Sequence, residues 1–498
     1  MRAPRETALR ETPSRQCCRT GRVRVLACLL SAATLLGGCA TYHPKPLDAD
    51  HRASTFLQSS LDDPALRSFM ERALGHSPPA WPLRTWDETN LVLAAFYFSP
   101  ELKVSRAAHF VAAAGRSTAK ERPNPTMGVT PAYNSTTTIP SPWIVTPTLD
   151  LPLETGGKRR YRVEEAAHLE EASRWDYASA AWALRARVRK SLLDTQTSGK
   201  ASGLLKTQLD LQAENLRCSE SQHAEGAISA FELSQARNAF NTSRLAFIDA
   251  QRQELTTRLA LAEAIGVPAE ALAGKSFTGP AWSAPQDLPA PPAQAGTRRS
   301  ALLFRSDLRA SLARYAALES ALRLELARQY PDVHLNPGYE FDQGDNKWAL
   351  GLTVTLPVLS RNRGPIAEAE ARRSEGEAAF LALQAHVIAE IDMALADYQS
   401  TLDAASTVQA AANTLQAEER TAVSMFQAGE ISTVDWIALR LQVAANQIAL
   451  MNTLDRAKQA LLALESARQE PDPAWAEVMK MAAHELPTPG SQRIKKAP

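Results

Sequence analysis

Residues 333–341 read VHLNPGYEF and residues 348–356 read WALGLTVTL, with Gly344, Asp345 and Asn346 between them. Apolar and polar residues alternate through both segments, which is the period of a β-strand with one apolar and one polar face. Residues 145–151 alternate in the same way, and a less regular segment lies around 127–134. Strands of about ten residues with this alternation suit a membrane barrel. The alternative is an antiparallel sheet that covers a soluble core.

Four such strands cannot close a barrel within one chain. An open strand edge cannot lie in lipid, because its backbone N–H and C=O groups would have no partners there. If these strands span a membrane, several chains must therefore share one barrel.

The chain is a duplication. Four landmarks recur in the same order about 205 residues later, and a repeat at a fixed offset indicates a repeated structural unit. They are the pairs Leu102 and Leu308, Pro125 and Pro331, Leu151 and Leu356, and Gly226 and Gly429. Each copy is predicted to contain a helix, two strands, a long helix, a turn and another helix.

The predicted helices are long. No proline occurs from 158 to about 222 or from 366 to about 427, and each run would be about 90–100 Å long at 1.5 Å per residue. Apolar residues inside the second run follow coiled-coil spacing, as at Ile388, Ile391, Leu395, Tyr398 and Leu402. These runs therefore predict coiled-coil rods.

The first 39 residues predict a targeting signal. Seven arginines precede the apolar run 25–36, which is too short to span a membrane and is followed by Leu36-Gly37-Gly38-Cys39. This end resembles a bacterial lipobox, whose cysteine is lipidated, and Ala40 resembles the next residue of lipoproteins sent to the outer membrane. An ordinary signal peptide with a chance cysteine is the alternative.

We predict six segments along the chain. They are a lipoprotein signal peptide (1–38), a lipidated N-terminal tail (39–85), repeat 1 (86–265), an extended proline-rich linker (266–296), repeat 2 (297–467) and a C-terminal tail (468–498).

Composition excludes several function classes. Of the 498 residues 45% are hydrophobic, which excludes wholesale disorder, and 55 basic against 54 acidic residues argue against a nucleic-acid binder. No stretch of about 18 apolar residues follows residue 39, so a polytopic helical membrane protein is not expected. Processing would leave only Cys39 and Cys218, too few for a disulfide framework or a zinc cluster.

Nothing in the sequence predicts an enzyme. His168 lacks the second histidine of a zinc-protease motif, and Gly156-Gly157-Lys158 lacks the other parts of a phosphate-binding loop. We expect no catalytic residues, no cofactor and no resident metal.

These elements together resemble the TolC family, the outer membrane factors of tripartite efflux pumps, over residues 86–467. The strings LPLETGGKR (151–159) and LPVLSRNRG (356–364) resemble its cobalt-zinc-cadmium resistance branch. The resemblance implies a mainly α protein with a membrane β-barrel. Three chains would form a homotrimer and give four strands each to a 12-stranded barrel, which stands on a long periplasmic coiled-coil tunnel.

The resemblance also implies partners and site residues. The chain would dock a periplasmic adaptor, which links it to a proton-driven inner-membrane pump, through two turns at the periplasmic tip. The expected contact residues are Gly226, Ile228, Ser229, Gly429, Ile431 and Ser432. Asp435 matches the first of two aspartates that narrow the pore in relatives, whereas the second position is Ala438; a solvated helix acid is the alternative reading of Asp435.

Three functions remain open at this point. The first is a passive exit duct for heavy-metal cations, mildly favoured by the acidic character of Asp332, His334, Glu340 and Asp342 on the polar strand face. The second is the same duct for drugs or other small organic molecules. The third is a lipid-anchored structural coiled coil of the cell envelope, which would leave the amphipathic strands unexplained.

Overall fold

The computed structural model describes residues 42–78, 80–136 and 141–470. The chain divides into two compact units, residues 1–55 and 56–498. In the first, the described residues are 42–55, which include the beginning of helix α2 (Ala49–Leu57). The predicted signal peptide, Cys39 and most of the C-terminal tail lie outside the described residues.

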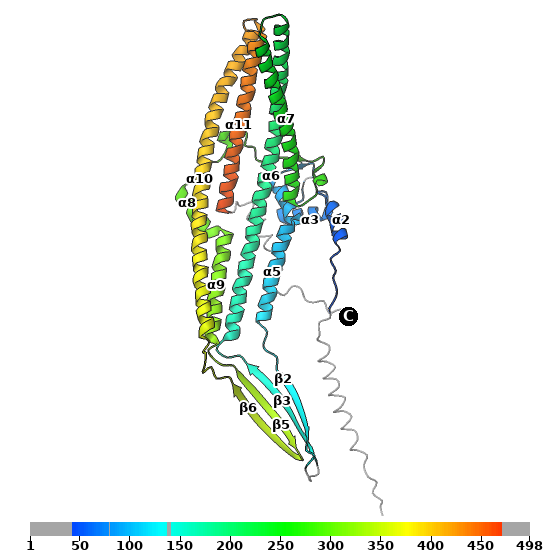
Figure 1. Cartoon of the computed structure of the whole chain (residues 1–498), viewed down its shortest axis with the longest axis vertical. Helices are drawn as coiled ribbons and strands as arrows, with labels where there is room; N and C mark the ends of the chain where they lie inside the picture. Colours follow the sequence, from blue (N-terminus) through cyan, green and yellow to red (C-terminus); the bar gives the residue numbers. More distant parts are fainter. Residues whose placement is uncertain (1–41, 79, 137–140, 471–498) are drawn as a thin grey trace, which may run out of the picture. The chain divides into compact units, whose positions relative to one another are not determined.

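The second unit contains the same order of elements twice (Figure 1). The first copy comprises α4 (Glu88–Phe98), α5 (Pro100–Ala119), β2 (Thr126–Tyr133), β3 (Trp143–Leu153), α6 (Lys158–Ala224) and α7 (Ala230–Ile265). The second comprises α8 (Gln294–Phe304), α9 (Ser306–Ala327), β5 (Val333–Asp342), β6 (Asp345–Val354), α10 (Arg363–Gln427) and α11 (Thr433–Arg468). The predicted order is observed, but the first helix of each copy is broken in two, at Ser99 and at Arg305.

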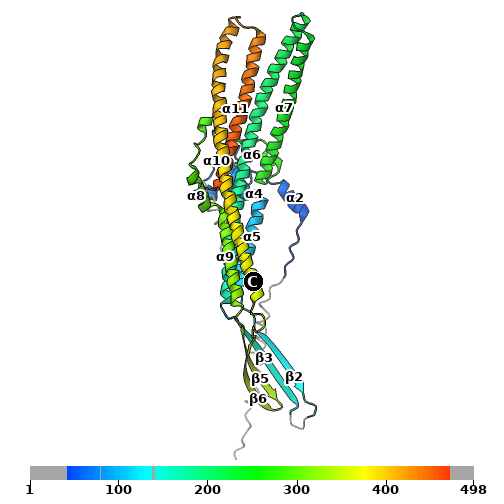
Figure 2. The same ribbon diagram turned by 60° about the vertical axis from the view of Figure 1, so that its left-hand side comes forward.

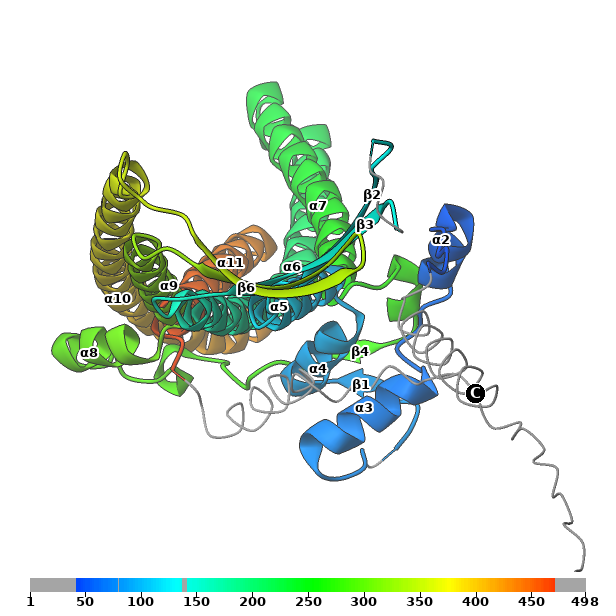
Figure 3. The same cartoon turned by 90° about the horizontal axis from the view of Figure 1, so that it is seen from below.

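The long helices form one curved layer, with α3 (Pro64–Leu74), α4 and α8 on one side of it (Figure 3). Helix α6 packs against α5, α7, α9 and α11, and α10 packs against α9 and α11. Toward their turns the hairpins α6/α7 and α10/α11 stand apart (Figure 2). The predicted coiled-coil residues Ile391, Leu395 and Tyr398 are buried, so this face of α10 is a packing face.

One helix in the described part of the chain, α10, has an 18-residue window that is apolar enough to cross a membrane by length and composition. This window differs from the expectation that no stretch of about 18 apolar residues follows residue 39. Only 17% of it is buried within the protomer. Length and composition alone do not make α10 a membrane span, because packing helices of other proteins share both properties.

The strands form one antiparallel sheet in the order β2-β3-β5-β6. Its register places Leu151 opposite Leu335, Leu335 opposite Leu352, and Tyr339 opposite Trp348. The apolar residues of all four strands therefore share one face, as the alternation predicts. Strand β3 is longer than the expected segment 145–151. Strand β6 starts earlier than expected, because the turn between β5 and β6 consists only of Gln343 and Gly344.

The proline-rich linker and the N-terminal tail are more ordered than predicted. The linker holds the 3-10 helices η1 (Ala269–Leu272) and η2 (Pro285–Asp287), and its strand β4 (Ser276–Phe277) pairs in parallel with β1 (Thr85–Trp86). Buried side chains of both segments join α4, α6 and α7 in one core; they include Leu61, Leu66, Met70, Trp86 and Leu272. The expected extended linker is thus a packed layer against the helices, held by apolar residues among its prolines.

Candidate functional site

The first turn between long helices joins α6 to α7. Gly226 has φ +76°, a left-handed conformation that glycine adopts without a side-chain penalty. The Ala227 amide donates to the Gln222 carbonyl oxygen at 2.7 Å, and His223 Nδ1 lies 3.1 Å from the Ile228 carbonyl oxygen. The turn is therefore closed by local hydrogen bonds, with Ile228 half-buried.

Ser229 caps helix α7. Its hydroxyl accepts the Glu232 amide at 3.2 Å, while the Glu232 carboxylate accepts the Ser229 amide at 2.7 Å. This reciprocal capping box satisfies two amides that the helix leaves free. The hydrogen bonds to Ser229 also hold the pKa of the Glu232 carboxyl below its ordinary value.

The second turn, between α10 and α11, repeats this geometry. Gly429 has φ +77°, and the Glu430 amide donates to the Met425 carbonyl oxygen at 2.9 Å. Ile431 is half-buried. Where the first turn has His223, the second has Phe426, whose ring stacks on Trp436 with centroids 5.7 Å apart. The two turns share a backbone but present different side chains.

Asp435 lies in the first turn of α11. Its amide donates to Ser432 Oγ at 3.1 Å, and its carboxylate accepts the Ser432 hydroxyl at 2.7 Å. Asp435 stands where the first copy has Glu232, so it is a capping partner as well as an exposed acid. Neither alternative considered for this residue from sequence included capping, although Ser432-x-x-Asp435 carries the signal.

The acidic residues of the polar strand face are paired within the protomer. Asp332 accepts Lys158 Nζ at 2.8 Å, and His334 Nδ1 lies 3.0 Å from the Asp150 carboxylate. Lys347 forms ion pairs with both Asp342 and Glu340. This pairing weakens the argument for cation preference that the sequence suggested.

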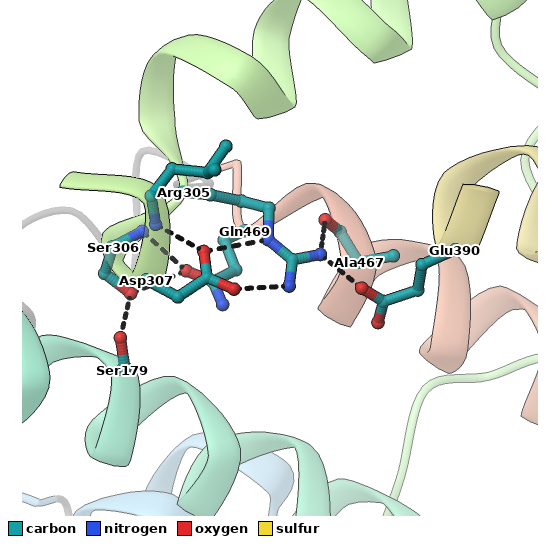
Figure 4. A network of polar contacts seen from close by, with 8 residues as sticks. Ser179, Arg305, Ser306, Asp307, Glu390, Ala467 and Gln469 are labelled. Carbon is teal, nitrogen blue, oxygen red and sulfur yellow. Dashed lines mark hydrogen bonds and ion pairs between the residues drawn. The ribbon is translucent and has the colours of Figure 1, made fainter. Parts of the chain in front are cut away.

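A buried arginine that sequence reasoning missed ties the middle of α10 to the last turn of α11 (Figure 4). Arg305 donates to the Asp307 carboxylate at 2.7 Å, to Glu390 Oε2 at 2.6 Å and to the Ala467 carbonyl oxygen at 3.0 Å. Beside it, Ser306 donates through its amide and hydroxyl to Gln469 Oε1 at 3.0 and 2.7 Å. The α8–α9 junction thereby fixes one point on α10 and the last turn of α11.

These contacts set the charge of the cluster. Burial alone would raise the pKa of Asp307, but hydrogen bonds and the charge of Arg305 outweigh it and hold that pKa below its ordinary value. A composition scan cannot find Arg305, since only the fold brings Asp307 and Glu390 to one guanidinium.

The described residues contain no group of three or more metal-ligating side chains. The six expected tip residues do gather in two repeat-matched turns. The lipidation site Cys39 lies outside the described residues.

The chain is similar in sequence to known proteins. A sequence profile of the outer membrane efflux protein family matches residues 95–267. The chain is 24% identical over 325 residues to the cobalt-zinc-cadmium resistance protein CzcC of Cupriavidus metallidurans, covering 64% of this chain and 75% of that protein. It is also 24% identical over 365 residues to the pyoverdine export outer membrane protein OpmQ of Pseudomonas aeruginosa, covering 67% and 73%.

The fold is similar to solved channel structures. The outer membrane protein VceC of Vibrio cholerae superposes with a TM-score of 0.61 at 20% identity, covering 76% of this chain and 95% of that chain. Identity this low supports the likeness of fold and no finer statement.

Proposed function

We propose that this chain, a TolC-like outer membrane factor near the cobalt-zinc-cadmium resistance branch, is the passive exit duct of a tripartite efflux system. The observation that carries the proposal is the pairing of a four-stranded amphipathic sheet with the long hairpins α6/α7 and α10/α11. The sheet would lie in the outer membrane, and the hairpins would form the wall of a periplasmic tunnel.

Closure of a barrel by three chains is supported by strand direction. Because neighbouring strands are antiparallel throughout β2-β3-β5-β6, the edge strands β2 and β6 also run in opposite directions. The β6 of one chain can therefore pair antiparallel with β2 of the next, and three chains give the even number of strands that such barrels have. Pairing would also satisfy the two open edges, which lipid does not tolerate.

The edge helices support the same assembly. Helix α10 leaves its apolar window largely uncovered, and α7 exposes Leu245, Ile248, Leu255 and Leu259 at helical spacing. These two helices lie at opposite edges of the curved layer (Figure 3). A homotrimer would bring α7 of one chain toward α10 of the next and cover both surfaces.

We propose the two turns as the docking surface for a periplasmic adaptor. The proposal concerns Ile228 and Ile431 first, because they are the apolar side chains of the two turns. The double variant Ile228→Glu/Ile431→Glu should lose adaptor co-purification and efflux at unchanged trimer yield. The control Asn452→Glu, an exposed position on α11 away from the turns, should keep both; normal efflux in the double variant would argue against docking there.

Heavy-metal cations are the proposed cargo, supported by the strings 151–159 and 356–364 and by the likeness to CzcC. The likeness to OpmQ favours small organic molecules as the second candidate. A deletion strain would be tested against zinc, cobalt, cadmium, nickel, copper and silver beside dyes, detergents and antibiotics. Hypersensitivity to metals alone supports the first cargo; hypersensitivity to organic compounds alone keeps the duct and discards the metals.

We further propose that Cys39 carries the lipid anchor. Cys39→Ser should abolish palmitate labelling, and labelling that persists would refute the assignment. The different class of function, a lipid-anchored spacer, predicts that Gly344→Cys cannot be labelled from outside intact cells. The duct predicts that it can, because the β5–β6 turn would face the exterior.

A further inference from the structure

Residues 355–363, which comprise the connection from β6 to α10 and the first residue of α10, expose apolar side chains. Strand β6 ends at Val354, and the chain then turns at Pro357, where the Val358 amide donates to the Leu356 carbonyl oxygen at 2.9 Å. The exposed fractions of Leu356, Val358 and Leu359 are 72%, 71% and 98%. Three neighbouring apolar side chains with this exposure indicate a surface that is covered in the working protein.

The same connection carries uncompensated positive charge. Arg361 and Arg363 are exposed, and among the described residues neither side chain has a hydrogen bond or an ion pair.

Nearby acids do not supply the missing partners. Glu325 is bonded to Arg328 and Asn362, Asp332 to Lys158, and Glu368 to Arg372. The guanidinium groups of the connection are therefore available to an anion from outside the chain.

Arg361 also has an unusual backbone conformation. Arg361 and Asn362 have φ +47° and +56°, whereas the first copy places Gly156 and Gly157 at the matching positions. A left-handed conformation costs a non-glycine residue about 1–2 kcal/mol. An arginine kept at a position where glycine is free of this cost suggests that its side chain has a use.

The sheet places this connection at one face of the membrane. Strands of 10 residues in β5 and 11 in β3 match the length that crosses the hydrocarbon core. At their far ends lie the aromatic pairs Tyr133–Trp143 and Tyr339–Trp348, which are typical of a membrane interface. Residues 355–363 follow the opposite ends, where the sheet meets the long helices (Figure 1).

We propose that residues 355–363 form a docking surface for the anionic phospholipids of the periplasmic leaflet. Leu356, Val358 and Leu359 enter the acyl region, and Arg361 and Arg363 bind the headgroup phosphates, which guanidinium groups contact in pairs of hydrogen bonds. The surface directly follows strand β6, exposes apolar side chains and has the complementary charge. The inference rests on the proposed orientation of the sheet in the membrane and does not depend on the cargo.

The test uses the purified full-length assembly and two lipids, phosphatidylglycerol and phosphatidylcholine. Wild type should bind phosphatidylglycerol more tightly, with a larger rise in unfolding temperature, and 0.5 M salt should reduce the difference. Arg361→Gln/Arg363→Gln should weaken phosphatidylglycerol binding about fivefold per arginine, since a basic residue near an anionic surface contributes about one kcal/mol. The matched control is Arg420→Gln, which should bind as wild type does. Arg420 is an exposed arginine on α10, about 85 Å along that helix from Arg363.

Three results would overturn the inference. The first is equal binding of both lipids by wild type, and the second is wild-type binding of phosphatidylglycerol by the double variant. The third is loss of the trimer by the double variant in phosphatidylcholine alone, which would assign the arginines to a neighbouring copy of the chain. Labelling of Gly344→Cys from outside intact cells tests the orientation separately, so failure of the duct proposal is distinguishable from failure of this one.

Discussion

Arg305 shows what one side chain contributes where four elements meet. Arg305 is 7% exposed, and its guanidinium donates to Asp307, Glu390 and the Ala467 carbonyl oxygen. Arg305→Met keeps much of the volume but leaves two carboxylates without their partner. We expect the free energy of unfolding of the variant to fall by about 1.5–3 kcal/mol, the usual range for hydrogen bonds to charged groups. Thermal unfolding at fixed protein concentration measures it, beside Arg299→Met, an exposed arginine of the preceding helix α8 that should change little.

The cost of Arg305→Met should depend on pH. The folded pKa of Asp307 lies below its unfolded value, so its pairing stabilises the protein above pH ~4 and is lost as pH falls through the folded pKa. The gap between wild type and Arg305→Met should therefore shrink as the pH is lowered from about 5 toward 3. A gap of constant size would mean that the Asp307 ion pair adds no stability.

Asp435 allows its two roles to be separated. Asp435→Asn removes the charge but keeps an oxygen that accepts the Ser432 hydroxyl, so the helix cap should survive. If three Asp435 side chains ring the pore, the variant should lose cation preference in single-channel recordings at unchanged stability. Unchanged selectivity would leave Asp435 with capping alone.

At the scale of elements, the turn pairs depend on their serine caps. Ser229→Ala and Ser432→Ala each remove an oxygen that accepts a first-turn amide, which typically costs about 1 kcal/mol. Because the turns lie at free ends, the loss should appear as faster hydrogen exchange in the first turn of α7 or α11. Ser234→Ala, an exposed serine in α7 outside the cap, is the control. Exchange that is unchanged in the cap variants would show that the turns are held by other contacts.

The strands and long helices could be predicted because their signals are local. Period-two alternation in 333–341 and the absence of proline in long runs are fixed by the residues themselves. The packed layer around Trp86 and Leu272 could not, since it brings together segments about 190 residues apart and its prolines suggested an extended chain. The two turns could be located because their sequence is repeated. The hydrogen bonds of Arg305 could not be predicted, because only the fold brings its partners together.

At the scale of the whole molecule, the sheet has two edges whose backbone groups need partners. A protomer alone offers none, so the prediction is a closed barrel in which β6 of one chain pairs with β2 of the next. Thr130→Cys on β2 would be combined with Ala349→Cys or Gly351→Cys on β6, all on the polar face, in a Cys218→Ser background. Oxidation should give covalently linked trimers on denaturing gels for at least one pair, because neighbouring strands bring Cα atoms within disulfide range. Thr148→Cys on the central strand β3, combined with Ala349→Cys, should not cross-link; trimers from that control, or none from any edge pair, would rule out this closure.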